Sequence, residues 1–122
     1  MKEDNIIQEK SFAFAIRIVK LYQYLCEEKK EFVLSKQLVR SGTSIGANVE
    51  EAIGGQSDKD FLSKIGISYK EARETIYWLK LMSATGYLDV RQSQSMLADA
   101  EELRKILGAI QLTLNKKATR NS

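Results

Sequence analysis

Two carboxylates, Glu71 and Glu74, are spaced so that both lie on one face of a helix, where such a pair could act as an acid and a base. Glycoside hydrolases use two carboxylates in this way. The chain supplies no nucleophile or sugar-binding platform beside them, so a hydrolase is the most distant function considered. A carboxylate within an apolar stripe normally has a partner, because burying it unpaired is costly. Arg40 is the natural candidate, since its planar guanidinium can bind a carboxylate through two hydrogen bonds.

These residues therefore predict a structural polar cluster rather than a catalytic site. Its expected members are Arg40, Ser44, Asn48, Glu51, Glu71 and Glu74. Two interpretations stay open. The cluster is either a buried polar network that fixes helix register or a subunit contact, or an exposed face with ordinary pairs between residues three or four apart.

The residue types that most catalytic and metal sites require are missing. Histidine is absent and Cys26 is the single cysteine, which argues against a zinc site and against a Ser–His or Cys–His pair. Di-iron bundles need Glu-x-x-His motifs, which this chain lacks. A lone cysteine fits a reducing compartment, and Cys26 is expected to be a small apolar residue of a helix. The sequence thus predicts no enzyme, no metal, no cofactor and no small-molecule substrate.

Basic side chains are the remaining candidates for binding chemistry. The net charge is only +3, from 19 basic and 16 acidic residues, so an anionic partner is permitted but not required. Three acidic residues, Asp99, Glu101 and Glu102, lie close to the basic ones in the sequence, and a mixed solvated surface is the plain interpretation for a monomer. In a ring, a modest basic strip repeated by symmetry would bind phosphates additively. The candidate nucleic-acid contacts are Arg17, Lys20, Arg104, Lys105, Lys116 and Lys117.

Aromatic side chains add a second possibility. Rings can stack on exposed bases, although at helical spacing they more often belong to a core or an interface. The residues concerned are Tyr22, Tyr24, Tyr69, Tyr77 and Trp78.

The elements that must position these residues are helices. Proline is absent from all 122 residues, as expected where long helices exclude it. Apolar spacing predicts helices over about 11–29, 35–54, 58–84 and 90–115, followed by a frayed basic tail over 116–122. Ser35 and Ser57 are expected N-caps, Asp89 and Gln92 resemble a capping box, and Gly86 a left-handed terminator. Short connections make sequential helices antiparallel, so the fold class is all-α: one domain over 1–122, an antiparallel up-down-up-down four-helix bundle.

Two local features bear on packing and assembly. The first predicted helix carries two apolar stripes instead of one, which suggests that part of its surface meets another subunit. In the second helix, Gly42 and Gly46 lie four residues apart on one side, where a neighbouring backbone could approach closely. The N-terminal residues are charged, and no long apolar run indicates a signal peptide or a membrane span, so a cytoplasmic protein without membrane contact is expected.

The second and third predicted helices carry a family resemblance. The segments LSKQLVRSGTSIGANVEEAIGG, DFLSKIGISYKEARETIYWLKL and TGYL resemble the four-helix-bundle proteins encoded in intervening sequences of bacterial 23S ribosomal RNA genes. The similarity spans about Ile6 to Leu114. A family pattern R-x-x-x-S-I-x-x-N-x-x-E falls on Arg40, Ser44, Ile45, Asn48 and Glu51. Where many relatives have N-I-x-E-G, this chain has NVEEA and reaches a glycine only at Gly54, so its second helix should be longer.

The resemblance implies a bundle that assembles as a homo-oligomer, in known relatives a pentameric ring. The chain is also similar to accessory proteins of diversity-generating retroelements, which bind nucleic acid and a reverse transcriptase. The leading hypothesis is therefore a non-enzymatic oligomeric module that binds structured RNA or DNA through a composite basic surface. The alternative is a protein-interaction scaffold, with a partner encoded nearby and no role for nucleic acid.

Overall fold

The first helix of the computed structural model, α1 (Lys2–Glu27), begins well before the residue 11 that the sequence predicts and ends two residues before the predicted 29. The structure describes residues 2–121, and side chains from 5 to 120. The early start follows from burial, because Ile7 and Ser11 continue the buried stripe of Phe14 and Ile18 towards the N-terminus. The segment before residue 11 also contains neither proline nor glycine to end a helix.

The second helix, α2 (Leu34–Ile53), is capped by a residue that the sequence did not indicate. Ser35 is not its N-cap, and Val33 at that position makes no side-chain hydrogen bond. Instead the buried carboxylate of Glu31 accepts hydrogen bonds from the backbone N–H groups of Val33 at 3.1 Å, Leu34 at 2.8 Å and Ser35 at 2.7 Å. Burial alone would raise the pKa of the Glu31 carboxyl, but these backbone hydrogen bonds hold its pKa below the usual value.

The two glycines inside α2 mark its contact with α1. A Cβ atom on Gly42 would lie 2.8 Å from side-chain atoms of Ile18, and one on Gly46 would lie 3.3 Å from the carbonyl oxygen of Ser11. The predicted close approach of a neighbouring backbone is therefore confirmed at Gly46, whereas Gly42 adjoins the Ile18 side chain. The helix then continues to Ile53, with Gly54 as its C-cap.

Local signals define the ends of α3 (Asp58–Ala84) and the start of α4 (Val90–Asn121) as predicted. The hydroxyl of Ser57 accepts from the backbone N–H of Asp60 at 3.1 Å. Gly86 has φ +86°, the left-handed conformation that glycine tolerates. Asp89 and Gln92 form the reciprocal capping box, with distances of 2.7 and 3.2 Å.

The predicted frayed tail is corrected by the structure, in which α4 continues through residues 116–121. No glycine or proline follows Gly108, so the sequence supplies nothing to end the helix. Ser122, the last residue of the predicted tail, lies outside the described residues.

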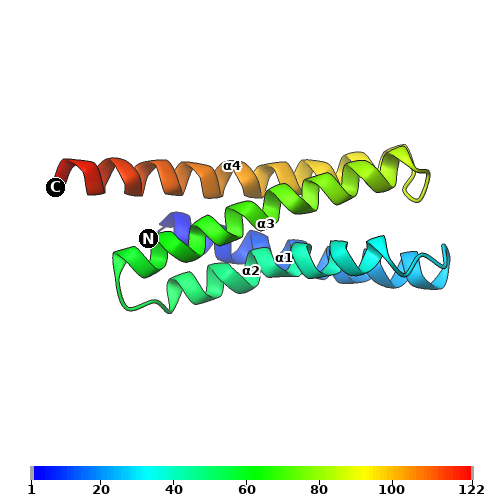
Figure 1. Cartoon of the computed structure of the whole chain (residues 1–122), viewed down its shortest axis with the longest axis horizontal. Helices are drawn as coiled ribbons and strands as arrows, with labels where there is room; N and C mark the ends of the chain where they lie inside the picture. The colour runs from blue at the N-terminus through cyan, green and yellow to red at the C-terminus, as the bar shows by residue number, and fades with distance from the viewer. Residues whose placement is uncertain (1, 122) are drawn as a thin grey trace.

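The four helices run antiparallel in sequence order, as expected for an up-down-up-down bundle (Figure 1). α1 packs on α2 and α4, and α3 packs on the same two helices, so α1 and α3 lie diagonally opposite in the described part of the chain. The turns α1–α2 and α3–α4 lie at one end, and both termini lie at the other, where α4 extends beyond its neighbours (Figure 1). One apolar core fills the interior, with Ile18, Leu25, Leu38, Ile45, Ile65, Leu79 and Leu107 among its fully buried members.

Candidate nucleic-acid interface

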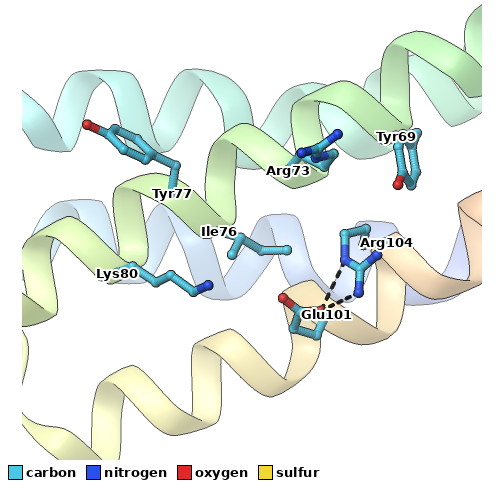
Figure 2. Close-up of a pocket in the computed structure, with 7 residues that line it drawn as sticks. All are labelled: Tyr69, Arg73, Ile76, Tyr77, Lys80, Glu101 and Arg104. Atoms are coloured by element: carbon cyan, nitrogen blue, oxygen red, sulfur yellow. Dashed lines mark hydrogen bonds and ion pairs between the residues drawn. The ribbon is translucent and has the colours of Figure 1, made fainter.

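A groove of about 520 Å³ lies between α3 and α4 on the side of the bundle away from α1 and α2. It is lined by Tyr69, Arg73, Ile76, Tyr77 and Lys80 of α3 and by Glu101 and Arg104 of α4. The α3 residues recur every three to four positions, so they share one helix face. Figure 2 shows the two tyrosines at opposite ends of this row, with Arg73 between them and the buried Ile76 nearer the middle of the groove.

The basic side chains that line this groove outnumber the acidic ones. Arg104 donates to the Glu101 carboxylate at 3.0 and 2.7 Å (Figure 2), and this bond, with a smaller contribution from the Tyr69 hydroxyl, raises the pKa of Arg104 above its ordinary value. Arg73 and Lys80 are exposed, and neither forms an ion pair within the part of the chain that the structure describes. The groove therefore contains two exposed cations without an ion pair among the described residues.

Two of the sequence-predicted nucleic-acid contacts, Arg17 and Lys20, belong to α1 and lie where this helix faces α4. Arg17 donates to Asp99 at 2.5 Å and to the hydroxyl of Ser95 at 2.8 Å, so its guanidinium ties α1 to α4. Lys20 is exposed and, together with Arg17 and Tyr24, lines a second depression between these helices. The structure thus gives Arg17 a packing contact and leaves Lys20 accessible.

The other four predicted contacts all belong to α4. Arg104 lies in the α3–α4 groove, and Lys105 is exposed beside it. Lys116 and Lys117 are exposed on the last turns of the helix. The six predicted residues therefore do not form a single patch, although four of them follow one helix.

All three carboxylates of α4 are engaged in ion pairs. Asp99 pairs with Arg17 at 2.5 Å, Glu101 with Arg104 at 2.7 Å and Glu102 with Lys10 at 3.1 Å. The acidic residues for which the sequence indicated a surface of mixed charge therefore each have a basic partner. Among the described residues, no ion pair involves the remaining basic side chains of α4, which are Arg91, Lys105, Lys116, Lys117 and Arg120.

The predicted polar cluster lies on the outer side of α2 and α3. Arg40 donates through Nη2 to both carboxylate oxygens of Glu74, at 2.6 and 2.5 Å, and through Nη1 to Glu71 at 3.3 Å. The hydrogen bond to Glu74 is the main cause that raises the pKa of Arg40 above its ordinary value. The Arg40 side chain is 47% exposed and that of Glu74 35%, so this is a surface ion-pair network that links two helices.

The remaining members of the predicted polar cluster make separate contacts. Ser44 donates to the carbonyl of Arg40 at 2.7 Å, and Asn48 donates to the carbonyl of Ser44 at 2.8 Å, so both bond within α2. Glu51 does not join them, because it lies three turns along the helix from Arg40 and its carboxylate is instead 3.7 Å from Lys64. The structure thus joins Arg40, Glu71 and Glu74 in one ion-pair network, whereas Glu51 lies near Lys64.

An apolar stripe remains exposed on α1. Phe12 is 67% exposed, and Ile16 and Val19 are also accessible. These residues, at positions i, i+4 and i+7, share one face of the helix. The other apolar stripe of α1, which includes Phe14 and Ile18, is buried in the core. The exposed stripe is the accessible part of the double stripe seen in the sequence.

Sequence reasoning missed Arg73 and Lys80 as candidate contacts. The available signal was the recurrence of Tyr69, Arg73, Tyr77 and Lys80 at steps of four, four and three, which places cations and rings on one face of α3. The sequence did not say that this face would adjoin α4. Without that pairing, no groove could be assigned.

The described residues contain neither a membrane-spanning helix nor a metal-binding group of side chains. None of the described helices is long and apolar enough to cross a membrane. No group of three or more Cys, Asp or Glu side chains there is arranged to hold a metal ion.

Residues 3–109 match the sequence family described as 23S rRNA-intervening sequence protein. The chain belongs to this family. A crystal structure of a family relative supports the same conclusion: it is a protein with unknown function from the S23 ribosomal protein family of Bacteroides thetaiotaomicron VPI-5482. It is 51% identical, with a TM-score of 0.87, and the match covers 88% of this chain and 96% of that one. No curated protein matches the chain.

Membership of the 23S rRNA-intervening sequence protein family accounts for the bundle and leaves its activity open. The matched residues include all of α2 and α3 and most of α4, but end before Lys116 and Lys117. Those two lysines are exposed on the part of α4 that lies beyond the matched region.

Proposed function

We propose that this protein is a non-enzymatic, self-associating four-helix module that binds structured RNA or DNA through the basic side of α4. The observation that carries the proposal is the uneven ion pairing of this helix. Its three carboxylates are partnered, whereas Lys105, Lys116 and Lys117 are exposed without an ion pair among the described residues. Exposed cations on one helix are suited to phosphate groups, because each contact releases counterions from the nucleic acid.

Self-association is supported by the exposed stripe of α1. Burying apolar surface stabilises a contact by about 25 cal/mol per Å², and Phe12, Ile16 and Val19 place such surface on one helix face. A second copy of this chain is the occupant we propose for the stripe, in the homo-oligomer that the family resemblance implies, for which a pentameric ring is favoured. Repetition around a ring would multiply the modest charge of each subunit into a strong basic field.

The test measures binding of a labelled RNA stem-loop by fluorescence anisotropy between about 50 and 200 mM salt. The wild-type protein should lose affinity steeply as salt rises. Reversing the three exposed lysines of α4 to glutamate should abolish most of the binding, whereas reversing three lysines near the α1–α2 turn, with the same change in net charge, should weaken it less. The two triple variants change Lys105, Lys116 and Lys117, or Lys29, Lys30 and Lys36. Salt-independent binding, no binding at low salt, or equal losses in the two variants would reject the basic side of α4 as the binding surface.

A protein-interaction scaffold is the second candidate, and the exposed apolar stripe of α1 is the observation that favours it. Under this alternative, the purified protein should recover one defined partner protein, and nuclease treatment should leave the recovery unchanged. Replacing Phe12 by Asp should then abolish recovery of the partner, while binding of RNA should be undetectable in the wild type.

A further inference from the structure

We propose that the α3–α4 groove binds unpaired nucleotides, with bases stacked on its tyrosines and phosphates held by Arg73 and Lys80. This inference rests on the proposed nucleic-acid function and specifies the site and the form of the nucleic acid. It is independent of the exposed lysines near the end of α4. The sequence indicates Tyr69 and Tyr77 as possible base-stacking rings, whereas Arg73 and Lys80 are not among the phosphate contacts predicted from it.

The rings of the groove are available to a ligand. Tyr77 is 58% exposed, and its ring stands edge-to-face on Trp78 with centroids 5.1 Å apart, which supports the ring without covering it. Tyr69 is half-buried, and its ring lies over Gly108, where an added Cβ atom would approach to 3.4 Å. Tyr69 thus packs beside Gly108 of α4 at one end of the groove, and Tyr77 stands at the other (Figure 2).

The spacing fits a short strand better than a single nucleotide. Tyr69 and Tyr77 are eight residues apart on α3, which corresponds to about 12 Å along the helix at ~1.5 Å per residue. Stacked nucleotides repeat every ~3.4 Å, so the row spans roughly three nucleotides. Arg73 lies between the rings (Figure 2), where the backbone of such a strand would pass. A single nucleotide could engage one ring and one cation, but not both ends.

The chemistry of the groove selects unpaired over paired nucleotides. Tyrosine rings can stack only on a base whose face is accessible, and the bases of a duplex cover one another's faces. Arg73 and Lys80 have no ion pair among the described residues, so binding a phosphate would not require them to break one. Glu101, bound to Arg104, is the carboxylate of the groove and would disfavour phosphates at that edge.

The experiment compares a labelled polyuridine strand with a blunt RNA duplex, each titrated with full-length protein at low salt. Tyr77→Ala should weaken binding of the single strand about tenfold, as expected for loss of one base–aromatic stack, and leave the duplex affinity unchanged. Tyr77→Phe should bind like the wild type, because it keeps the ring. Phe32→Ala removes a ring of similar exposure, 54%, at the α1–α2 turn and serves as the matched control with no expected effect.

Two further readouts address the cations and the position of the ligand. Removing Arg73 and Lys80 together should reduce the slope of log affinity against log salt by ~0.7 for each charge on the single strand. Trp78 is the one tryptophan of the chain and adjoins Tyr77, so the single strand should quench its fluorescence. Circular dichroism of each variant establishes that the helices are intact.

The outcomes separate the two proposals. If wild-type protein binds both probes but Tyr77→Ala and the double variant bind the single strand normally, the groove inference is wrong and the basic side of α4 remains the binding surface. If Tyr77→Ala lost equal affinity for the single strand and for the duplex, the groove inference would also be overturned. Tyr77 would then affect binding through the structure of the protein and not by stacking on a base. If wild-type protein binds neither probe, both the groove and the nucleic-acid function are rejected.

Discussion

Replacing Glu31 by Gln should destabilise the protein far more than the same change at Glu28, the first residue of the α1–α2 turn. Glu31 is only 7% exposed, and its two carboxylate oxygens accept three backbone N–H groups at the start of α2. In the Gln variant, the amide oxygen can still accept from Val33 and Leu34, but the amide NH₂ faces the N–H of Ser35. One buried donor is then unpaired, and the negative charge at the helix N-terminus is lost.

The cost can be estimated from these contacts. Loss of a helix cap costs about 0.5–2 kcal/mol, and a buried donor without an acceptor about 1–3 kcal/mol. The terms overlap, so we expect a loss of about 2 kcal/mol, equivalent to roughly 8 °C in Tm for a domain of this size. Glu28→Gln, at an exposed position, should change stability by less than ~0.5 kcal/mol.

The assay is urea unfolding followed by circular dichroism at a fixed protein concentration, first near pH 7 and then at falling pH. The pKa of Glu31 is lower in the folded protein than its ordinary value, so its contribution is fully present above the unfolded pKa of about 4.3. This contribution is lost as the pH falls through the folded pKa. The gap between wild type and Glu31→Gln should therefore narrow in acid. Equal stability of the two Gln variants at neutral pH would refute the cap, and a gap that does not narrow in acid would refute the assigned role of the charge.

Two other substitutions test the packing and the surface pairs. Gly42→Ala should lower the free energy of unfolding by about 1 kcal/mol, measured as a lower urea midpoint. The added methyl group would overlap the buried, β-branched Ile18 at 2.8 Å, which costs ~1–3 kcal/mol and outweighs the ~1 kcal/mol gained in helix propensity. A variant as stable as wild type would show that α1 can move away. Arg40→Ala should cost less than ~1 kcal/mol in the same assay, since the ion pair with Glu74 lies at the surface and is partly exposed; a loss of several kcal/mol would show that the network is buried in the assembled protein.

Much of the fold could be predicted because its signals are local. The apolar period of α4 and the caps at Ser57 and Asp89 involve residues a few positions apart, and the structure has them as predicted. The start of α2 could not be predicted in this way. Glutamate is not a usual N-cap, and the turn that brings Glu31 to the helix includes Lys30 with φ +53°. That conformation depends on the tight connection between two packed helices.

The candidate site was less predictable, because it depends on which helix faces adjoin. Arg40 and Glu74 could be paired by chemistry alone, since a carboxylate within an apolar stripe of the sequence is expected to have a partner. Arg73 and Lys80 share a face that is visible in the sequence, but the groove exists only because α4 packs beside it. Arg17 was expected to be free for phosphate and is instead held by Asp99, a partner distant in the sequence.

Self-association and RNA binding are tested together by the solution mass of nuclease-treated protein, measured by light scattering alone and with RNA at low salt. We expect a mass near five times the 13.8 kDa of one chain, which rises further with RNA and falls when Phe12 is replaced by Asp while the helices stay intact. A monomer whose mass does not change when RNA is added would contradict both the self-association through α1 and the nucleic-acid function.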